Sequence, residues 1–229
     1  MKSGAPLIVT RPEPGNGATV ARARAMGFDA RSLPLFAARP LDWTVPAAGA
    51  FDALLLTSAS APRLAGPGLS ALASLPVHAV GAATADAANA AGLAVDAVGT
   101  AGAQQLLDGM ASRNIRRILW LCGRDRSEFD ARGAAITSLP CYAVDPIAPS
   151  AEWAHLIDRP ALLLAHSVRA AAYVSELVGA ARGHLALVAI SAQVAAAAGD
   201  GWGDLAIAGQ PDDGAMLAQA HALWHKVPK

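Results

Sequence analysis

Short runs of apolar residues recur along the chain and alternate with longer, alanine-rich stretches. Six of these runs have the almost entirely apolar composition of buried strands. They are Leu7–Val9, Ala53–Leu56, Val77–Val80, Ile118–Leu121, Leu162–Leu164 and Leu187–Ile190. Near-continuous apolar strands separated by helices are typical of a parallel sheet that is covered on both faces. The pattern therefore predicts an α/β fold.

Helical segments follow most of the predicted strands. They are expected at residues 17–26, 83–91, 101–112, 127–137, 168–177, 192–198 and 213–224. The last segment begins with two acidic residues, which suit the positive end of a helix dipole, and carries an apolar stripe. The stripe consists of Met216, Leu217, Ala220, Leu223 and Trp224.

Three short motifs occur twice, in the same order. The matched positions are Leu56 and Leu164, Val80 and Ile190, and Pro34 and Pro140, which lie 108, 110 and 106 residues apart. These offsets favour two related halves, each a small α/β domain, which face a shared cleft. Chance similarity among alanine-rich strand–helix units is the alternative. Prolines cluster around the Pro34 and Pro140 motifs, so we interpret both stretches as extended crossings between the domains.

Composition and charge narrow the class of protein. The 229 residues are 54% hydrophobic, which excludes a disordered chain. Eighteen basic and 18 acidic side chains cancel, which argues against a nucleic-acid-binding protein. A small anionic ligand is still allowed, because backbone amides bind anions without adding formal charge.

The chain has the features expected of a cytoplasmic protein. The apolar stretch near the N-terminus is too short for a signal peptide. The uncharged run between Arg63 and Asp86 is long enough to span a bilayer, but its glycines, prolines and histidine indicate loops and a strand instead. Cys122 and Cys141 lack the spacing of a zinc site, which favours a reducing compartment.

Several standard sites are excluded by the sequence. There is no nucleophile elbow and no P-loop. Gly15 and Gly17 follow the first strand, but Val20 stands where a dinucleotide-binding loop needs its third glycine. His221 and His225 lie four residues apart and could share a metal; without a third ligand, an exposed helix face is the stronger interpretation.

Hydroxyl side chains recur where predicted strands pass into helices. They are Thr10, Thr57, Ser58, Ser60, Thr84, Ser167 and Ser191. Each one alone can be an ordinary helix N-cap. As a group they lie at the carboxyl ends of parallel strands, where open α/β sheets bind ligands, and helix N-termini there suit a ligand with many carboxylates.

The sequence resembles the uroporphyrinogen-III synthase family over nearly its whole length. The resemblance is carried by low-information motifs whose order and spacing together are specific. They are Leu7–Pro12, Gly27–Phe28, Leu33–Pro34, Phe51–Ala59, Val80–Ala85, Gly92, Gly123–Arg124, Tyr142 and Ser167, followed by the final alanine-rich corner.

The resemblance implies two α/β domains with parallel sheets flanked by helices, joined by two extended linkers, with the active-site cleft between the domains. Residues 1–34 and 150–229 would form the first domain and 43–138 the second, with linkers at 35–42 and 139–149. The implied activity is the cyclisation of hydroxymethylbilane to uroporphyrinogen III, with loss of water and inversion of ring D, in haem, sirohaem, chlorophyll or cobalamin biosynthesis. It implies no metal and no organic cofactor.

The resemblance also assigns site residues. Tyr142 matches the tyrosine that assists loss of the hydroxyl, with a tyrosine packed on a domain edge as the alternative. The expected substrate-binding residues are Thr10, Arg11, Ser58, Ser60, Gly81, Thr84, Arg124, Ser167, Ser191 and Gln193. Among the cations, binding is favoured for Arg11, whereas Arg124 and Arg126 can instead form surface salt bridges with Asp125 or Glu128.

Other expectations concern partners and departures from the family. We expect a monomer that can receive its substrate by transient hand-over from hydroxymethylbilane synthase, with no nucleic acid and no membrane.

Val194 replaces a threonine, so Ser191 or Gln193 would have to substitute for it. Ala143 stands where a basic residue is frequent, and His166 replaces another threonine. These changes leave open a non-catalytic homologue that binds a tetrapyrrole or other polycarboxylate, and a generic two-lobed binding protein is a third possibility.

Overall fold

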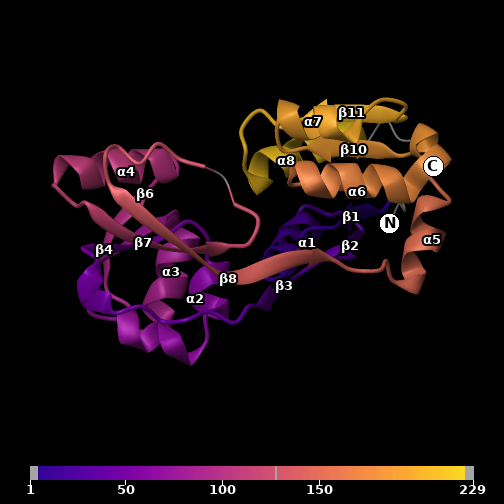
Figure 1. The fold of residues 1–229 in the computed structure, drawn as a ribbon. Helices are drawn as coiled ribbons and strands as arrows, with labels where there is room; N and C mark the ends of the chain where they lie inside the picture. Colours follow the sequence, from indigo (N-terminus) through magenta and orange to yellow (C-terminus); the bar gives the residue numbers. More distant parts are fainter. Residues whose placement is uncertain (1–4, 127, 225–229) are drawn as a thin grey trace. The chain divides into compact units, whose positions relative to one another are not determined.

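The computed structural model describes residues 5–126 and 128–224 and divides the chain into two compact units. Unit 1 consists of the chain up to Ala37 together with the chain from Pro146 onward, and unit 2 of Ala38–Asp145. The positions of the two units relative to one another are not determined, so each is described by itself (Figure 1).

Unit 1 contains a five-stranded parallel sheet. The strand order is β11-β10-β9-β1-β2, and every pairing in it is parallel. The strands are β1 (Leu7–Val9), β2 (Ala30–Ser32), β9 (Leu162–Ala165), β10 (Ala186–Ala189) and β11 (Asp204–Ile207). The three central strands, β1, β9 and β10, are buried along their full length, as their apolar sequences require.

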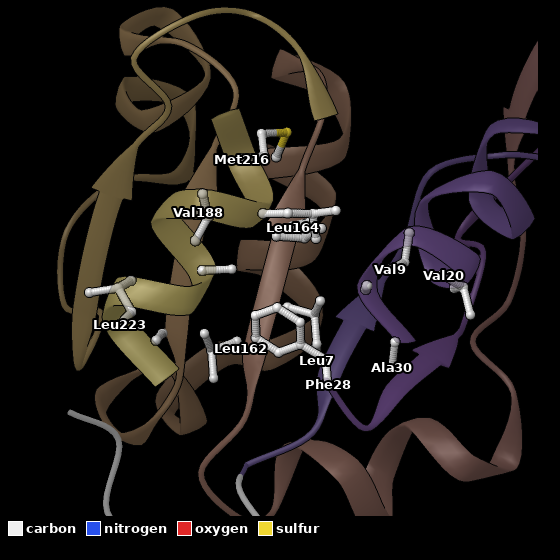
Figure 2. Close-up of a cluster of buried hydrophobic side chains, with 14 of the residues drawn as sticks. Leu7, Val9, Val20, Phe28, Ala30, Leu162, Leu164, Val188, Met216 and Leu223 are labelled. Carbon is white, nitrogen blue, oxygen red and sulfur yellow. The ribbon is translucent and has the colours of Figure 1, made fainter. Parts of the chain in front are cut away.

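Helices cover both faces of the unit 1 sheet. On one face α1 (Gly15–Ala25) and α8 (Asp213–Trp224) enclose a core with the strand residues Leu7, Leu162 and Leu164 (Figure 2). Side chains alternate along a strand, so the buried Ile8, Leu163 and Leu187 point to the opposite face. There α6 (Val168–Val178) and α7 (Ala192–Ala198) pack against the sheet and each other. The remaining elements are α5 (Ala151–Ile157) and η3 (Gly179–His184).

Unit 2 contains a six-stranded sheet in the order β3-β8-β7-β4-β5-β6. The pairings from β8 to β6 are parallel. The strands are β3 (Phe36–Pro40), β4 (Ala53–Leu56), β5 (Val77–Val80), β6 (Val95–Gly99), β7 (Arg117–Gly123) and β8 (Ala135–Pro146). The ends of β3 and β8 extend across the boundary between the units, so the proline-rich crossings are themselves strands of this sheet.

Two apolar layers sandwich the unit 2 sheet. On one face α2 (Ser60–Leu64), η2 (Pro67–Leu72) and α3 (Ala82–Ala90) pack on Leu54, Leu56 and Leu121. On the other face α4 (Ala103–Ser112) packs on Leu55 and Trp120. A short 3-10 turn, η1 (Ala48–Ala50), precedes β4.

The structure confirms the α/β class, the six apolar strands and six of the seven predicted helices. The helix predicted at 127–137 is wrong: residue 127 lies outside the described residues, 128–134 form loop and turn, and β8 begins at Ala135. Arg132 and Gly133 both have positive φ, which ends regular helix geometry, and Ile136 and Thr137 are β-branched. None of the described helices is long and apolar enough to cross a membrane.

Candidate active site

The Tyr142 side chain lies over the carboxyl end of the unit 2 sheet. Tyr142 belongs to β8 and pairs with Gly123, the last residue of β7. The backbone N–H of Arg124 donates to the Tyr142 carbonyl at 2.9 Å, which fixes the strand at this point. The Ser58 side chain, which follows β4, forms a hydrogen bond with the phenol. Tyr142 thus meets the ends of two neighbouring strands.

The surroundings of Tyr142 extend the pH range over which its phenol is neutral. Burial raises the pKa of Tyr142, because the tyrosinate anion would lose hydration, and the hydrogen bond from Ser58 acts weakly in the opposite direction. A neutral phenol carries a proton that it can donate in a hydrogen bond. The site therefore holds a proton donor at neutral pH.

Four predicted residues of unit 2 other than Tyr142 lie at the same edge of the sheet. The Ser58 hydroxyl accepts from the Ser60 N–H at 3.2 Å, so it caps the turn that leads into α2. Gly81 has φ +78° and stands at the N-terminus of α3, with open space where a Cβ would be. Thr84 is buried in the first turn of this helix. Glycine is required at Gly81 by the backbone, and it leaves the start of α3 uncovered.

Arg124 is paired with acidic residues within unit 2. Its guanidinium contacts Asp145 closely and Asp125 at 3.4 Å, and Arg39 binds the second oxygen of Asp145 at 2.7 Å. The predicted salt bridge with Asp125 is therefore the weaker of two, since Asp145 is the main partner. Arg126 Nη1 donates to the Arg124 carbonyl at 3.4 Å. A ligand carboxylate would compete with Asp145 for Arg124.

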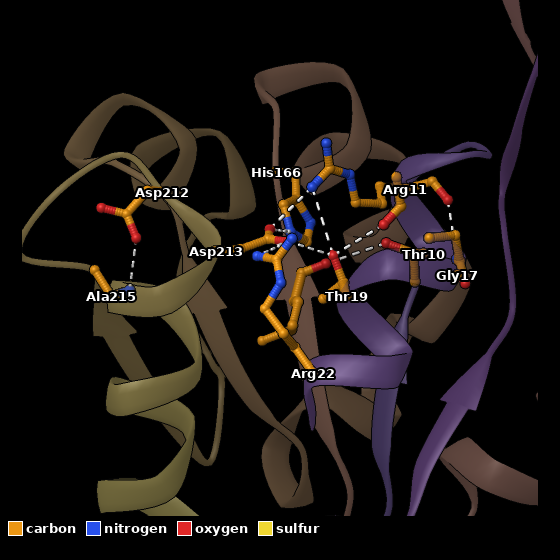
Figure 3. A network of polar contacts seen from close by, with 12 residues as sticks. Thr10, Arg11, Gly17, Thr19, Arg22, His166, Asp212, Asp213 and Ala215 are labelled. Atoms are coloured by element: carbon orange, nitrogen blue, oxygen red, sulfur yellow. Dashed lines mark hydrogen bonds and ion pairs between the residues drawn. The ribbon is translucent and has the colours of Figure 1, made fainter. Parts of the chain in front are cut away.

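A second polar cluster lies at the carboxyl edge of the unit 1 sheet and is centred on Asp213 (Figure 3). Asp213, the first residue of α8, has a side chain that is only 9% exposed. Its carboxylate accepts from Arg11 at 2.9 Å, Thr19 at 2.6 Å and Arg22 at 3.0 Å. His166 Nε2 lies 3.0 Å from the same carboxylate. One acid thus joins α8 to β1, α1 and β9.

Asp213 remains ionised within this cluster. Burial by itself would raise the pKa of Asp213, but hydrogen bonds from His166 and Thr19 and the charge of Arg11 outweigh it. They hold the pKa well below the ordinary value for aspartate. Arg11, which we expect from the sequence to meet a substrate carboxylate, already has a carboxylate partner in its own chain.

The predicted hydroxyls of unit 1 fall into two kinds. Thr10 is fully buried and its hydroxyl donates to the Leu164 carbonyl at 3.2 Å, so it joins β1 to β9 and is not exposed to a ligand. Ser167 and Ser191 are N-caps, which accept from the N–H groups of Ala170 at 3.1 Å and Val194 at 3.4 Å. Each capping hydroxyl keeps its own hydrogen for a further acceptor.

The surroundings of Val194 and Ala143 explain two of the departures from the family pattern. Val194 is buried at the position of α7 that corresponds to Thr84 in α3, and Gln193 beside it is exposed. Unit 1 therefore carries its hydroxyl at the N-cap, on Ser191, where unit 2 has Gly81. Ala143 is fully buried, so this position offers no room for a basic side chain.

The structure brings together residues that the sequence did not connect. Asp213 and His166 lie 47 positions apart, and only the unusual histidine before Ser167 and the acid at a helix start signalled them separately. His221 is exposed on α8, and His225, four residues further on, lies outside the described residues. Within the described chain, no group of three histidine, cysteine or acidic side chains is placed to hold a metal.

Comparison with known proteins gives a family and a fold. The model of the family described as uroporphyrinogen-III synthase HemD matches residues 17–218. A crystal structure of uroporphyrinogen-III synthetase from Helicobacter pylori is 15% identical with a TM-score of 0.68, and covers 96% of this chain and 99% of its own. A mutant uroporphyrinogen III synthase from the extremely thermophilic bacterium Thermus thermophilus is 20% identical with a TM-score of 0.53, and covers 97% and 100%. At these identities the structural likeness concerns the fold. No curated protein sequence gives a significant match.

Proposed function

Because this chain belongs to the uroporphyrinogen-III synthase family of cyclising lyases, we propose that Tyr142 is the acid of its reaction. The enzymes of this family act in tetrapyrrole biosynthesis on hydroxymethylbilane. The reaction removes the terminal hydroxyl as water, inverts ring D and closes the macrocycle to uroporphyrinogen III. The observation that carries the proposal is the neutral, half-buried phenol held at the strand ends by Gly123 and Ser58.

Tyr142 would act on the leaving hydroxyl. A hydroxyl leaves more easily as water than as hydroxide, so a donor that begins to give it a proton lowers the barrier. The overall reaction also releases a proton when the pyrrole ring that has formed the new bond regains its aromatic form, and this proton can return to the phenol. No strong nucleophile is needed, because hydroxymethylbilane closes unaided to the uninverted isomer. Much of the remaining task is to orient the chain for attack at ring D.

The substrate carboxylates would be held at the starts of α3, α6 and α7. The uncovered N-terminus of α3 beside Gly81 offers free backbone N–H groups and a positive dipole end. Ser167 and Ser191 can each donate an O–H hydrogen while their oxygens cap a helix. Ser58, Ser60 and Gln193 remain proposed contacts, and Thr84 supports the start of α3 from within.

The two arginines are proposed to bind carboxylates by exchange of partners. Arg11 is held by Asp213 and Arg124 by Asp145, so substrate binding at either one would compete with an internal ion pair. Such an exchange contributes little net affinity, because one pair replaces another. We therefore place most of the affinity on the backbone amides and hydroxyls.

We further propose that the protein works as a cytoplasmic monomer that receives hydroxymethylbilane directly from hydroxymethylbilane synthase. Direct transfer would shorten the time in which the substrate closes spontaneously. Isomer analysis of a coupled reaction, with and without an excess of a trap enzyme that consumes free hydroxymethylbilane, tests the hand-over.

The test of function is the isomer composition of the product formed from hydroxymethylbilane. We expect the type III isomer, and a loss of about 10²-fold in kcat for Tyr142→Phe, because the phenyl ring fills the same space without a proton to donate. Tyr173→Phe is the matched control: Tyr173 Oη donates to the Ile147 carbonyl within unit 1, at 3.3 Å, and the variant should keep its rate.

Two outcomes would contradict the proposal. Formation of type I isomer alone at the spontaneous rate would exclude the synthase activity. Tight binding of uroporphyrinogen III without turnover, equal in the parent protein and in Tyr142→Phe, would favour a non-catalytic homologue. The buried Val194 and Ala143, which depart from the family pattern, are the residues that motivate this alternative.

A further inference from the structure

We propose that Gly123 is a positioning residue for Tyr142, because its missing side chain leaves the space in which the phenol lies. This inference rests on the proposed role of Tyr142 as the acid. A Cβ built on Gly123 would lie 3.0 Å from Tyr142 Cζ and 3.1 Å from its hydroxyl oxygen. All three of the nearest atoms belong to the Tyr142 side chain. The hydroxyl end of the phenol thus rests on the bare backbone of Gly123.

An irregularity between β7 and β8 directs the phenol to this place. Cys122 pairs with Pro140, but the next residue, Gly123, pairs with Tyr142, so Cys141 is an extra residue in β8. Side chains normally alternate between the two faces of a sheet, and an extra residue resets that alternation. As a result Cys141 and Tyr142 both pack on the layer that contains Leu121.

The sequence at the irregularity fits this geometry. Pro140 lacks a backbone N–H, and proline within a sheet is tolerated at such points. Gly123 has no positive φ, so its backbone does not itself demand glycine. It is the contact with the phenol that makes a side chain unfavourable at this position.

The expected effect of a side chain at Gly123 is a displacement of the phenol. An added methyl group at 3.0–3.2 Å from the phenol would push it away by a few tenths of an ångström. Proton donation depends on the distance and direction of the donor, and a misplacement of about 1 Å can cost about 10²-fold in rate. We therefore expect Gly123→Ala to lower kcat about tenfold, with little change in KM.

The decisive experiment is a double-mutant cycle in the assay with hydroxymethylbilane. Gly123→Ala should slow type III formation in the parent protein but cause no further loss in the Tyr142→Phe background, because the hydroxyl it displaces is then absent. Gly49→Ala is the control, since a Cβ at this ordinary glycine of unit 2 meets nothing within 4 Å. The alkaline transition of Tyr142, followed by tyrosinate absorbance, should also move toward that of an exposed tyrosine in Gly123→Ala.

The outcomes separate the two proposals. A Tyr142→Phe variant with the parent rate would reject the acid, whatever Gly123→Ala does. A slow Tyr142→Phe variant together with an unaffected Gly123→Ala variant, or an equal loss in both backgrounds, would reject the positioning role alone. If Gly123→Ala folds poorly, Tyr142→Ala should restore its folding, because it removes the ring against which the methyl group packs; failure to do so would also reject the proposal.

Discussion

Tyr142 shows how neighbouring residues give an ordinary side chain a defined chemical state. The phenol packs against the layer around Leu121 and against Gly123, and it forms a hydrogen bond with Ser58. Burial disfavours the charged form, so the proton stays on the oxygen. An ordinary tyrosine is already protonated at neutral pH, and this environment extends the protonated form to higher pH.

A difference titration tests the state of Tyr142. Its pKa is raised, so the phenol should remain protonated until the pH exceeds the ordinary tyrosine value of about 10. We expect the absorbance of the parent protein minus that of Tyr142→Phe to show one tyrosinate transition with a midpoint above about pH 10. A midpoint below this value would show that the hydroxyl is exposed, or that a cation lies beside it.

At the scale of elements, Asp213 determines how α8 is attached to its sheet. α8 covers the core face with Met216, Leu217 and Leu223, but its start is held by polar contacts to residues from α1 and from the ends of β1 and β9. An acid at this position is favoured by the helix dipole and by the surrounding donors. The apolar stripe determines which face of α8 packs on the sheet, and Asp213 anchors the N-terminus of the helix.

Asp213→Asn should lower the free energy of unfolding by about 2 kcal/mol, because it removes the charge shared by Arg11, Arg22 and His166. Urea denaturation measures this. Asp212→Asn is a matched control: Asp212 accepts from the Ala215 N–H at 2.9 Å, and asparagine caps a helix equally well. A similar loss in both variants would contradict the special role of Asp213.

The contacts of Asp213 also predict how the stability of the protein depends on pH in acid. A lowered folded-state pKa means that the contribution of Asp213 is complete above the unfolded value of about 3.9 and is lost as the pH falls below it. Between about pH 4 and pH 2 the parent protein should therefore lose stability more steeply than Asp213→Asn. If the free energy of unfolding fell in parallel with pH in the two proteins, the neighbours of Asp213 would not lower its pKa.

Two strands that the sequence patterns missed, and one helix that they predicted wrongly, depend on structure outside the local pattern. The buried central strands are continuous apolar runs, whereas β6 and β11 alternate between exposed and less exposed positions and each contains an acid. Their pairing partners, rather than their own composition, make them strands. The 128–134 segment has helix-forming residues, but positive φ at Arg132 and Gly133 directs the chain into β8 instead.

At the scale of the whole molecule, the two sheets share one order of strands. In unit 1 the order from β2 is β2-β1-β9-β10-β11, and in unit 2 the order from β8 is β8-β7-β4-β5-β6. The repeated motifs around Leu56 and Leu164 lie on β4 and β9, which occupy the same place in this order. In unit 1 the first two strands precede the repeat in sequence, and in unit 2 they follow it.

The charge balance of the whole chain leads to a prediction about salt. Acidic and basic side chains cancel, and Arg11 and Arg124 are paired within the protein. Without long-range attraction, kcat/KM for hydroxymethylbilane should fall less than about threefold between about 50 and 200 mM salt. Asp145→Asn, which removes the carboxylate shared by Arg39 and Arg124, should steepen this dependence. A steep fall of kcat/KM with salt in the parent protein would contradict this prediction, because it would indicate unpaired basic side chains at the binding site.

The sequence by itself determined the class of the fold, its buried strands and the hydroxyl residues that follow several of them. It could do so because burial and helix capping depend on residues that are close together along the chain. The tertiary structure alone decided what each of these residues contacts. Arg11 meets Asp213, Thr10 is enclosed against Leu164, and an extra residue in β8 brings Tyr142 over Gly123. Such contacts join positions far apart in the chain, and they depend on strand register and on the meeting of separate elements, which no local pattern records.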